Sequence, residues 1–236
     1  MTKTKLKPMV KATPKIRPAA STAQLEKIAK DDGMAVFGVA ELGPIHSTFR
    51  HEILKAAHEM IFGVVMGYRL SDPVIDDIVD GPTLLYKHHY KVANYMLDRA
   101  ACHVAARINA AGYKALPIPA SQMIDWLDYY GHLSHKAVAT QAGLGWIGRS
   151  ALFIHPEHRG RLRLVSVLTD MPLVPGRPLP KQDHCGRCRL CIVSCPAGAI
   201  TEDGYDRHKC ADKLKEFSKQ PGIGQNICGL CVKVCK

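Results

Sequence analysis

The stretch Cys185-Gly-Arg-Cys188-Arg-Leu-Cys191-Ile-Val-Ser-Cys195-Pro196 decides how this chain is organised. Its cysteines have the spacing C-x2-C-x2-C-x3-C, and a proline follows the last of them. A second group begins with a long gap, ends in C-x2-C-x3-C, and consists of Cys210, Cys228, Cys231 and Cys235. Eight of the nine cysteines therefore lie between residues 185 and 235, and this segment is expected to be organised around its thiols.

The spacing of the first run is typical of iron–sulfur ligation. Thiolates three residues apart on a tight loop reach neighbouring iron corners of one cubane 4Fe–4S cluster. In two-cluster ferredoxins, the fourth cysteine of such a run ligates the other cluster. This rule predicts one cluster on Cys185, Cys188, Cys191 and Cys235. It predicts a second cluster on Cys195, Cys210, Cys228 and Cys231.

Other uses of cysteine fit the pattern less well. Structural zinc usually takes two C-x2-C pairs per ion, and a three-member run followed by C-P is uncommon for it. Disulfides need an oxidising compartment, and we expect no export signal here. Cys102 stands apart in a helical pattern, where a lone cysteine is expected to be a small buried hydrophobe.

Composition restricts the class of protein. The hydrophobic content of 47% is that of an ordinary globular chain, and no apolar stretch reaches the roughly 18 residues of a membrane helix. The formal net charge is 32 − 21 = +11, and two clusters of about −2 each would bring it to about +7. Residues 1–20 carry six basic residues and no acidic one, which predicts a disordered basic tail. We expect a cytoplasmic protein with no membrane partner.

Hydrophobic periodicity predicts a mixed α and β region ahead of the cysteines. Helices are expected over residues 22–30, 49–58, 84–111, 121–128 and 135–142, and Thr83 is placed to cap the longest of them. Strands are expected over 36–40 and 61–68, with an extended edge segment over 115–119. Residues 151–155 and 161–169 are expected to pair as a hairpin, and the proline-rich residues 170–181 to form a linker.

Two further stretches are candidates for chemistry. Residues 128–136 are dense in protic side chains, and they include Tyr129, His132, His135 and Lys136. Residues 143–148 read G-x-G-x-x-G, but a dinucleotide loop needs a strand before it and a helix after it. Here the expected order is reversed. The glycines therefore predict a tight helix-to-strand connection, or a place where backbone approaches a flat cofactor.

The segment Ala142-Gly-Leu-Gly-Trp-Ile-Gly148, the segment Val167-Leu-Thr-Asp170 and the cysteine order together resemble the epoxyqueuosine reductase family. That family is related to the catalytic domains of reductive dehalogenases, and the resemblance covers about residues 22–235. It implies an α+β fold, with a nitroreductase-like α/β sandwich over residues 21–175. A small two-cluster ferredoxin-like domain follows over residues 182–236. It also implies cobalamin in the first domain, with FMN as the alternative.

The resemblance also directs attention to a proton donor. Family members use an aspartate ahead of the Gly-Leu-Gly motif, and Tyr129 takes that place here, with Asp128 beside it. Because reductive dehalogenases use a tyrosine acid, Tyr129 and Asp128 are the candidate catalytic residues. The candidate cofactor-binding residues are His132, His135, Lys136, Gly143, Gly145 and Trp146. Epoxyqueuosine reductases continue well past the cluster domain in a part that helps to hold transfer RNA, which makes transfer RNA a doubtful substrate.

Two functions remain in view. The first is a corrinoid-dependent reductase that receives electrons from a low-potential donor such as ferredoxin or flavodoxin and passes them through two clusters. The alternative is an electron-transfer protein that serves a partner enzyme and has no substrate of its own. Retention of a corrinoid at one per chain would separate the two.

Overall fold

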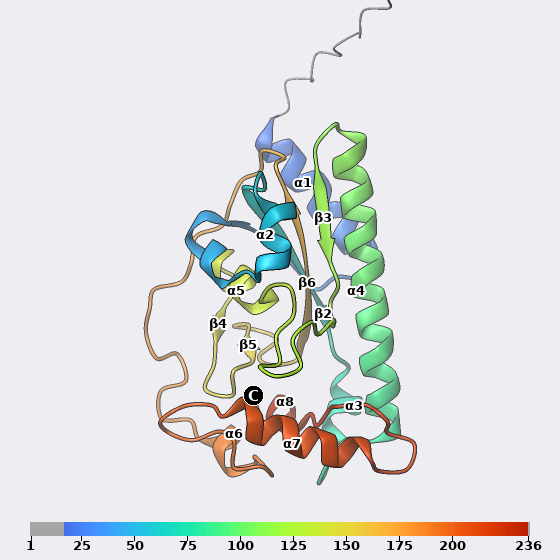
Figure 1. The fold of residues 1–236 in the computed structure, drawn as a ribbon, viewed down its shortest axis with the longest axis vertical. Helices are drawn as coiled ribbons and strands as arrows, with labels where there is room; N and C mark the ends of the chain where they lie inside the picture. Colours follow the sequence, from blue (N-terminus) through green and yellow to red (C-terminus); the bar gives the residue numbers. More distant parts are fainter. Residues whose placement is uncertain (1–16, 236) are drawn as a thin grey trace, which may run out of the picture.

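The structure is a computed structural model that describes residues 17–235, and it combines a layered sheet with a helical unit below it (Figure 1). We call residues 17–175 the sheet unit and residues 182–235 the cysteine unit. Helix α1 (Pro18–Asp31) begins within the last three residues of the predicted tail. The remainder of that tail, residues 1–16, lies outside the described residues.

The central sheet has four strands in the order β1-β2-β6-β3, and every neighbouring pair is antiparallel. The strands are β1 (Val36–Glu41), β2 (Phe62–Arg69), β3 (Ala115–Ile118) and β6 (Leu162–Thr169). All but one residue of β6 are buried, because helices cover both faces of the sheet. Strand β3 lies at the edge, where Pro117 opposes Val167 and its missing N–H is tolerated.

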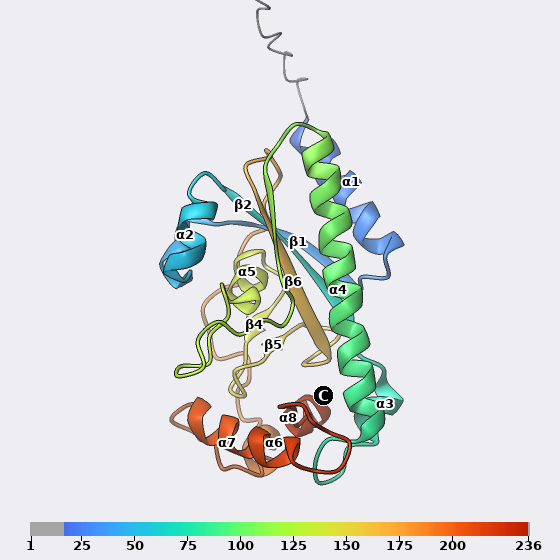
Figure 2. The ribbon, with the colours of Figure 1, turned by 45° about the vertical axis from the view of Figure 1, so that its right-hand side comes forward.

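Two helices cover one face of the sheet and two shorter ones cover the other (Figure 2). Helix α1 and the long α4 (Leu84–Ala110) form the first layer, where Leu97 and Val104 meet Val64. Helices α2 (His51–Ala57) and α5 (His135–Gln141) form the second, where Val138 meets Leu168. The predicted cap is present, since the Thr83 hydroxyl accepts from the N–H of Tyr86 at 3.1 Å. A short 3-10 helix, η1 (Gly43–Thr48), precedes α2.

The helix predicted over residues 121–128 was wrong. The segment forms turns closed by a bridge between Asp125 and Tyr130. The Asp125 carboxylate accepts from the N–H groups of Leu127 and Asp128, both at 2.9 Å. A side chain that satisfies its neighbours' N–H groups in this way competes with the helical hydrogen-bond ladder.

The predicted pairing of residues 151–155 with 161–169 was also wrong. Strand β5 (Phe153–Ile154) pairs with β4 (Trp146–Ile147), whereas β6 pairs with β2 and β3. Gly145 permits the β4–β5 pairing, because a Cβ on it would lie 2.0 Å from the carbonyl oxygen of Ile154. Both segments contain the expected strands, but a hydrophobic pattern carries no information about pairing partners.

The cysteine unit contains α6 (Leu190–Val193), α7 (Arg207–Ser218) and α8 (Leu230–Val234). A separate apolar cluster joins it to α3 (Asp72–Asp76) and the start of α4, where Ile78 and Tyr86 meet Ile223 and Leu230. The predicted linker, residues 170–181, has neither helix nor strand, yet it is tied to the sheet unit, since Gly176 N–H donates to the Val39 carbonyl at 2.8 Å. Within residues 17–235, no helix has the length and apolar character needed to cross a membrane.

Candidate functional site

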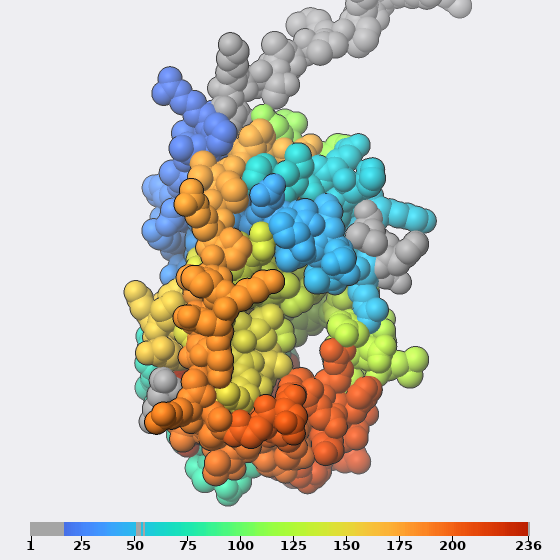
Figure 3. Space-filling model, turned by 90° about the vertical axis from the view of Figure 1, so that its left-hand side faces the viewer, coloured from blue at the N-terminus to red at the C-terminus, as the bar shows by residue number. Residues whose placement is uncertain are grey.

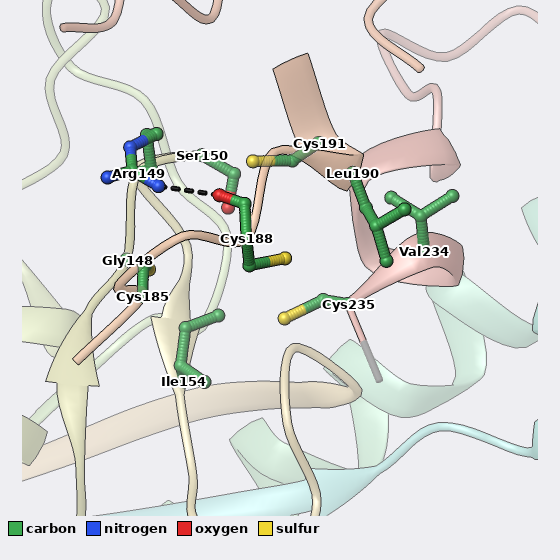
Figure 4. A pocket seen from close by; sticks show the side chains of 10 residues that line it. All are labelled: Gly148, Arg149, Ser150, Ile154, Cys185, Cys188, Leu190, Cys191, Val234 and Cys235. Atoms are coloured by element: carbon green, nitrogen blue, oxygen red, sulfur yellow. Dashed lines mark hydrogen bonds between the residues drawn. The ribbon is translucent and has the colours of Figure 1, made fainter. Parts of the chain in front are cut away.

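Four cysteines from both ends of the cysteine unit line one small pocket of about 40 Å³, and they are Cys185, Cys188, Cys191 and Cys235. Figure 4 shows the sulfur atoms of Cys188, Cys191 and Cys235 directed toward a shared space. The opposite wall comes from the sheet unit, through Gly148, Arg149, Ser150 and Ile154. The pocket therefore lies between the two units.

The other four cysteines, Cys195, Cys210, Cys228 and Cys231, also lie near one another. Burial raises the pKa of Cys228 to about 11 and that of Cys231 to about 12, and repulsion from the Cys210 and Cys195 thiolates adds to both shifts. Helix α7 carries Cys210 and α8 carries Cys231. The Cys195 sulfur accepts from the N–H of Ala199 at 3.3 Å.

The donor sets fit iron–sulfur clusters. Four neighbouring thiols that repel one another as thiolates need a cationic partner, and the iron core of a cluster supplies one. Nowhere in residues 17–235 do three or more His, Cys, Asp or Glu side chains converge on one metal ion. A group of thiols set around a space suits a multi-iron cluster better than a single zinc. The grouping agrees with the expected exchange of Cys195 and Cys235, and ligation itself stays a prediction.

The lone Cys102 lies on α4 and is exposed. The expectation of a buried hydrophobe was wrong for this residue. Its neighbours on the helix, Ala101 and Val104, are buried instead. Cys102 lies within the expected helix, but it is on the solvent-facing side of that helix.

The loop of residues 125–130 holds the candidate acid, and arginines from two distant segments fasten it. Arg50 pairs with Asp125 at 3.1 Å. The guanidinium groups of Arg50 and Arg207 lie over the ring of Tyr130, at 3.8 and 4.3 Å from its centroid. Arg207 also donates to the Asp128 carbonyl at 2.8 Å, so this loop connects the sheet unit with α7. Figure 3 shows an opening between the yellow-green loop region and the red-orange residues of the cysteine unit.

Tyr129 is the most constrained residue of the loop, with a left-handed φ of 56°, a conformation uncommon for a bulky residue. Its ring lies 5.7 Å from that of His208, and the Lys215 ammonium is 5.5 Å from its centroid. The pKa of Lys215 is raised, first by its hydrogen bond to Tyr129 and then by that to Asp212. The side chain of Asp128 is exposed to solvent.

His135 differs from the other predicted cofactor residues because both of its ring nitrogens are engaged. Its Nε2 lies 3.0 Å from the Pro119 carbonyl and its Nδ1 lies 3.0 Å from the Ser166 hydroxyl. A carbonyl only accepts, so Nε2 carries the proton and Nδ1 accepts from Ser166. Burial lowers the pKa of His135 to about 4. In this arrangement His135 has no free nitrogen to offer a metal.

His132 and Lys136 flank this half-buried histidine. His132 Nε2 lies 3.1 Å from Gln122 Oε1. Lys136 donates to the carbonyl of Ala151 at 2.6 Å, and its pKa is lowered by burial and then by Arg207. Lys136 thus ties α5 to the segment that forms one wall of the cysteine pocket.

The glycines of the G-x-G-x-x-G stretch serve chain packing. A Cβ on Gly143 would lie 2.1 Å from the Arg177 carbonyl, and Gly143 has a φ of +79°. Together with Gly145, which abuts Ile154, it makes the tight helix-to-strand connection that was expected. Trp146 stacks on His184 at 4.6 Å. The Nε1 of Trp146 and the Oγ1 of Thr140 are buried without a hydrogen-bond partner.

Sequence reasoning missed Arg50, Arg149, Arg207 and Lys215. Arg207 is 79 positions from its acceptor at Asp128, and Arg149 is 39 from Cys188. No local pattern connects such pairs. The one usable signal is weak: Arg149 directly follows the glycine stretch, on the side toward the cysteines.

Comparison with known proteins gives consistent relatives. No family model matches the chain. An epoxyqueuosine reductase from Bacillus cereus is 35% identical over 114 residues, which are 44% of this chain and 30% of that protein. A tetrachloroethene reductive dehalogenase from Sulfurospirillum multivorans is 35% identical over 133 residues, which are 48% of this chain and 26% of that protein. The matches thus span less than a third of these two relatives' own length.

Solved structures agree on the fold. A catabolic reductive dehalogenase in complex with 3-bromo-4-hydroxybenzoic acid has a TM-score of 0.74 at 20% identity, over 93% of this chain and 32% of that one. An epoxyqueuosine reductase with an epoxyqueuosine-modified tRNA stem loop has a TM-score of 0.60 at 18% identity, over 90% of this chain and 64% of that one. The chain is therefore related in sequence to epoxyqueuosine reductases and reductive dehalogenases, and it shares their mixed α/β fold with an antiparallel sheet.

Proposed function

We propose that this chain is an iron–sulfur reductase that holds two 4Fe–4S clusters in a ferredoxin-like domain and a corrinoid in a nitroreductase-like domain. One observation supports it above the others. Cysteines from both groups share a pocket whose opposite wall belongs to the sheet unit. A plain electron carrier needs no such wall, whereas a reductase needs its clusters close to the domain in which substrate is reduced.

Two buried polar groups of the sheet unit are candidate partners for a corrinoid. The buried Nε1 of Trp146 and Oγ1 of Thr140 lack partners, and buried polar groups of this kind usually have one. These two groups would hold polar groups of the cofactor. The hydrogen bond from Lys136 to the Ala151 carbonyl would support the neighbouring segment of residues 148–154. A bound corrinoid would supply the cobalt chemistry of a two-electron reduction, as in a reductive dehalogenase described as B12-dependent. His135 would orient α5 and would not be a metal ligand, because both of its ring nitrogens are engaged.

Tyr129 is the proposed proton donor. When its hydroxyl gives up a proton to the reduced substrate, the phenolate left behind faces the Lys215 ammonium. Arg50 and Arg207 hold the loop, and so the hydroxyl, in position. Asp128, which is exposed, is the second candidate. Positioned acids of this kind contribute about 10²- to 10⁴-fold in rate.

The electron donor is proposed to be a low-potential ferredoxin or flavodoxin, and the location cytoplasmic. The substrate class follows the relatives: a halogenated phenol-like molecule or a modified base. A tRNA stem loop is bound by one structural relative, so such a stem loop belongs among the substrates tested. The aromatic and cationic side chains around Tyr130 are able to contact either kind of ring.

The test is anaerobic reconstitution with iron, sulfide and hydroxocobalamin, followed by desalting, iron analysis and a visible spectrum. About eight irons and one corrinoid per chain support the reductase. About eight irons without corrinoid would support the electron-transfer alternative. A yellow chromophore released by heat would replace the corrinoid with FMN, and absence of iron would refute the proposal entirely.

A further inference from the structure

Arg149 is a nearly buried cation that reaches from the sheet unit into the loop of the first cysteine group. Its side chain is 14% exposed, and it lines the pocket of Cys185, Cys188, Cys191 and Cys235. Nη1 donates to the Cys188 carbonyl at 2.6 Å, and Nη2 donates to Asp183 at 3.1 Å and to the Gly186 carbonyl at 3.4 Å. Figure 4 shows this guanidinium beside Cys188.

A second arginine separates two roles that Arg149 could have. Arg189 donates to the same carbonyls, of Gly186 at 2.8 Å and of Cys188 at 3.1 Å. It belongs to the cysteine unit, is 40% exposed and pairs with Glu202. The two carbonyls therefore have a donor without Arg149. What Arg149 adds is a link to the sheet unit and a positive charge away from bulk water.

That charge is only partly offset. Its carboxylate partner, Asp183, is 61% exposed, and water screens an exposed charge more than a buried one. The guanidinium faces the pocket side, whereas Asp183 faces solvent. A cluster in this pocket would therefore experience a net positive potential from the pair.

We propose that Arg149 is a positioning residue that docks the first cysteine group against the glycine stretch, and that its charge raises the reduction potential of the cluster held there. This rests on the proposed function. The cluster would accept one electron from a low-potential donor, and its total charge with four thiolates would go from about −2 to about −3. A nearby cation stabilises the more negative state, and net charge and solvent exposure are among the factors that set cluster potentials.

The test is a redox titration of the reconstituted protein with dithionite, followed by electron paramagnetic resonance. Arg149→Gln should move one of the two reduction steps to lower potential. At a fixed applied potential the reduced-to-oxidised ratio of that cluster should fall roughly tenfold, which corresponds to about 59 mV for one electron. Arg149→Lys keeps the charge and should stay near the wild-type value. Arg189→Gln, the matched control, should leave both steps in place. Cys210→Ser removes one proposed ligand of the second cluster and should abolish that cluster. The reduction step that remains in this variant then belongs to the first cluster, the one beside Arg149.

Asp183→Asn provides a second measurement in a variant expected to fold. The asparagine oxygen still accepts from the Cys185 N–H, as Asp183 does at 3.0 Å, but the offsetting charge is gone. The first step should then move to higher potential, opposite to Arg149→Gln. Unchanged potentials in both variants, with about eight irons retained, would overturn the inference and leave the proposed function standing. Absence of clusters in the wild-type protein would instead overturn the proposed function.

Discussion

The half-buried His135 should make the stability of this protein fall steeply in mild acid. Its pKa is about 4 when folded and about 6.5 when unfolded. Between these pH values the unfolded chain binds almost one proton more than the folded chain, so the free energy of unfolding falls as pH falls. The stability that neutral His135 contributes is fully present above pH 6.5 and is lost by pH 4. For these two pKa values, the loss between pH 7 and pH 5 is about 2 kcal/mol.

The substitution His135→Gln isolates this contribution. A glutamine amide can still donate to the Pro119 carbonyl and accept from Ser166, but it does not titrate. Urea unfolding of the reconstituted protein, under anaerobic conditions at pH 7 and pH 5, should show a pH dependence about 2 kcal/mol smaller in the variant. The other titrating groups cancel in the difference. Equal pH dependence in the two proteins would mean that His135 is accessible to protons, and the hydrogen-bond assignment would be wrong.

Three further outcomes are expected. Cys188→Ser should reduce the iron content from about eight to about four per chain, whereas serine at the exposed Cys102 should change nothing; full iron in the first variant would contradict the ligand grouping. Tyr129→Phe should abolish turnover while clusters and corrinoid remain, and unimpaired turnover would remove it as the acid. Gly145→Ala should cost about 3 kcal/mol of unfolding free energy, because its Cβ would meet the Ile154 carbonyl at 2.0 Å. Alanine at Gly43, which has open space around it, is the control, and similar stability of the two variants would refute the packing argument.

The long, strongly patterned elements were predictable from the sequence. The period of α4 and its Thr83 cap, the apolar runs of β1 and β2, and the edge position of β3 all follow from local rules. The spacing rule also placed Cys235 with Cys185, Cys188 and Cys191, and these four line one pocket, while their ligation of a cluster stays a prediction. In each case, the controlling interactions lie within a few residues of one another or follow a general spacing rule.

What escaped prediction depends on distant partners. The turn at residues 121–128 looked helical by its apolar spacing, but the Asp125 carboxylate captures the N–H groups that a helix would use. The pairing of β5 with β4 depends on close backbone contact at Gly145. Arg207 reaches the loop from another unit. A single sequence shows the chemical type of such residues but not which ones meet.

The apolar cluster between α4 and the cysteine unit also determines when this part of the chain can fold during synthesis. A ribosome makes every strand of the sheet before it makes Ile223, Ile227 and Leu230, the residues that cover Ile78 and Tyr86. Cys235, which completes the first thiol group, is made later still. During synthesis the start of α4 therefore presents an exposed apolar surface until the end of the cysteine unit has been made.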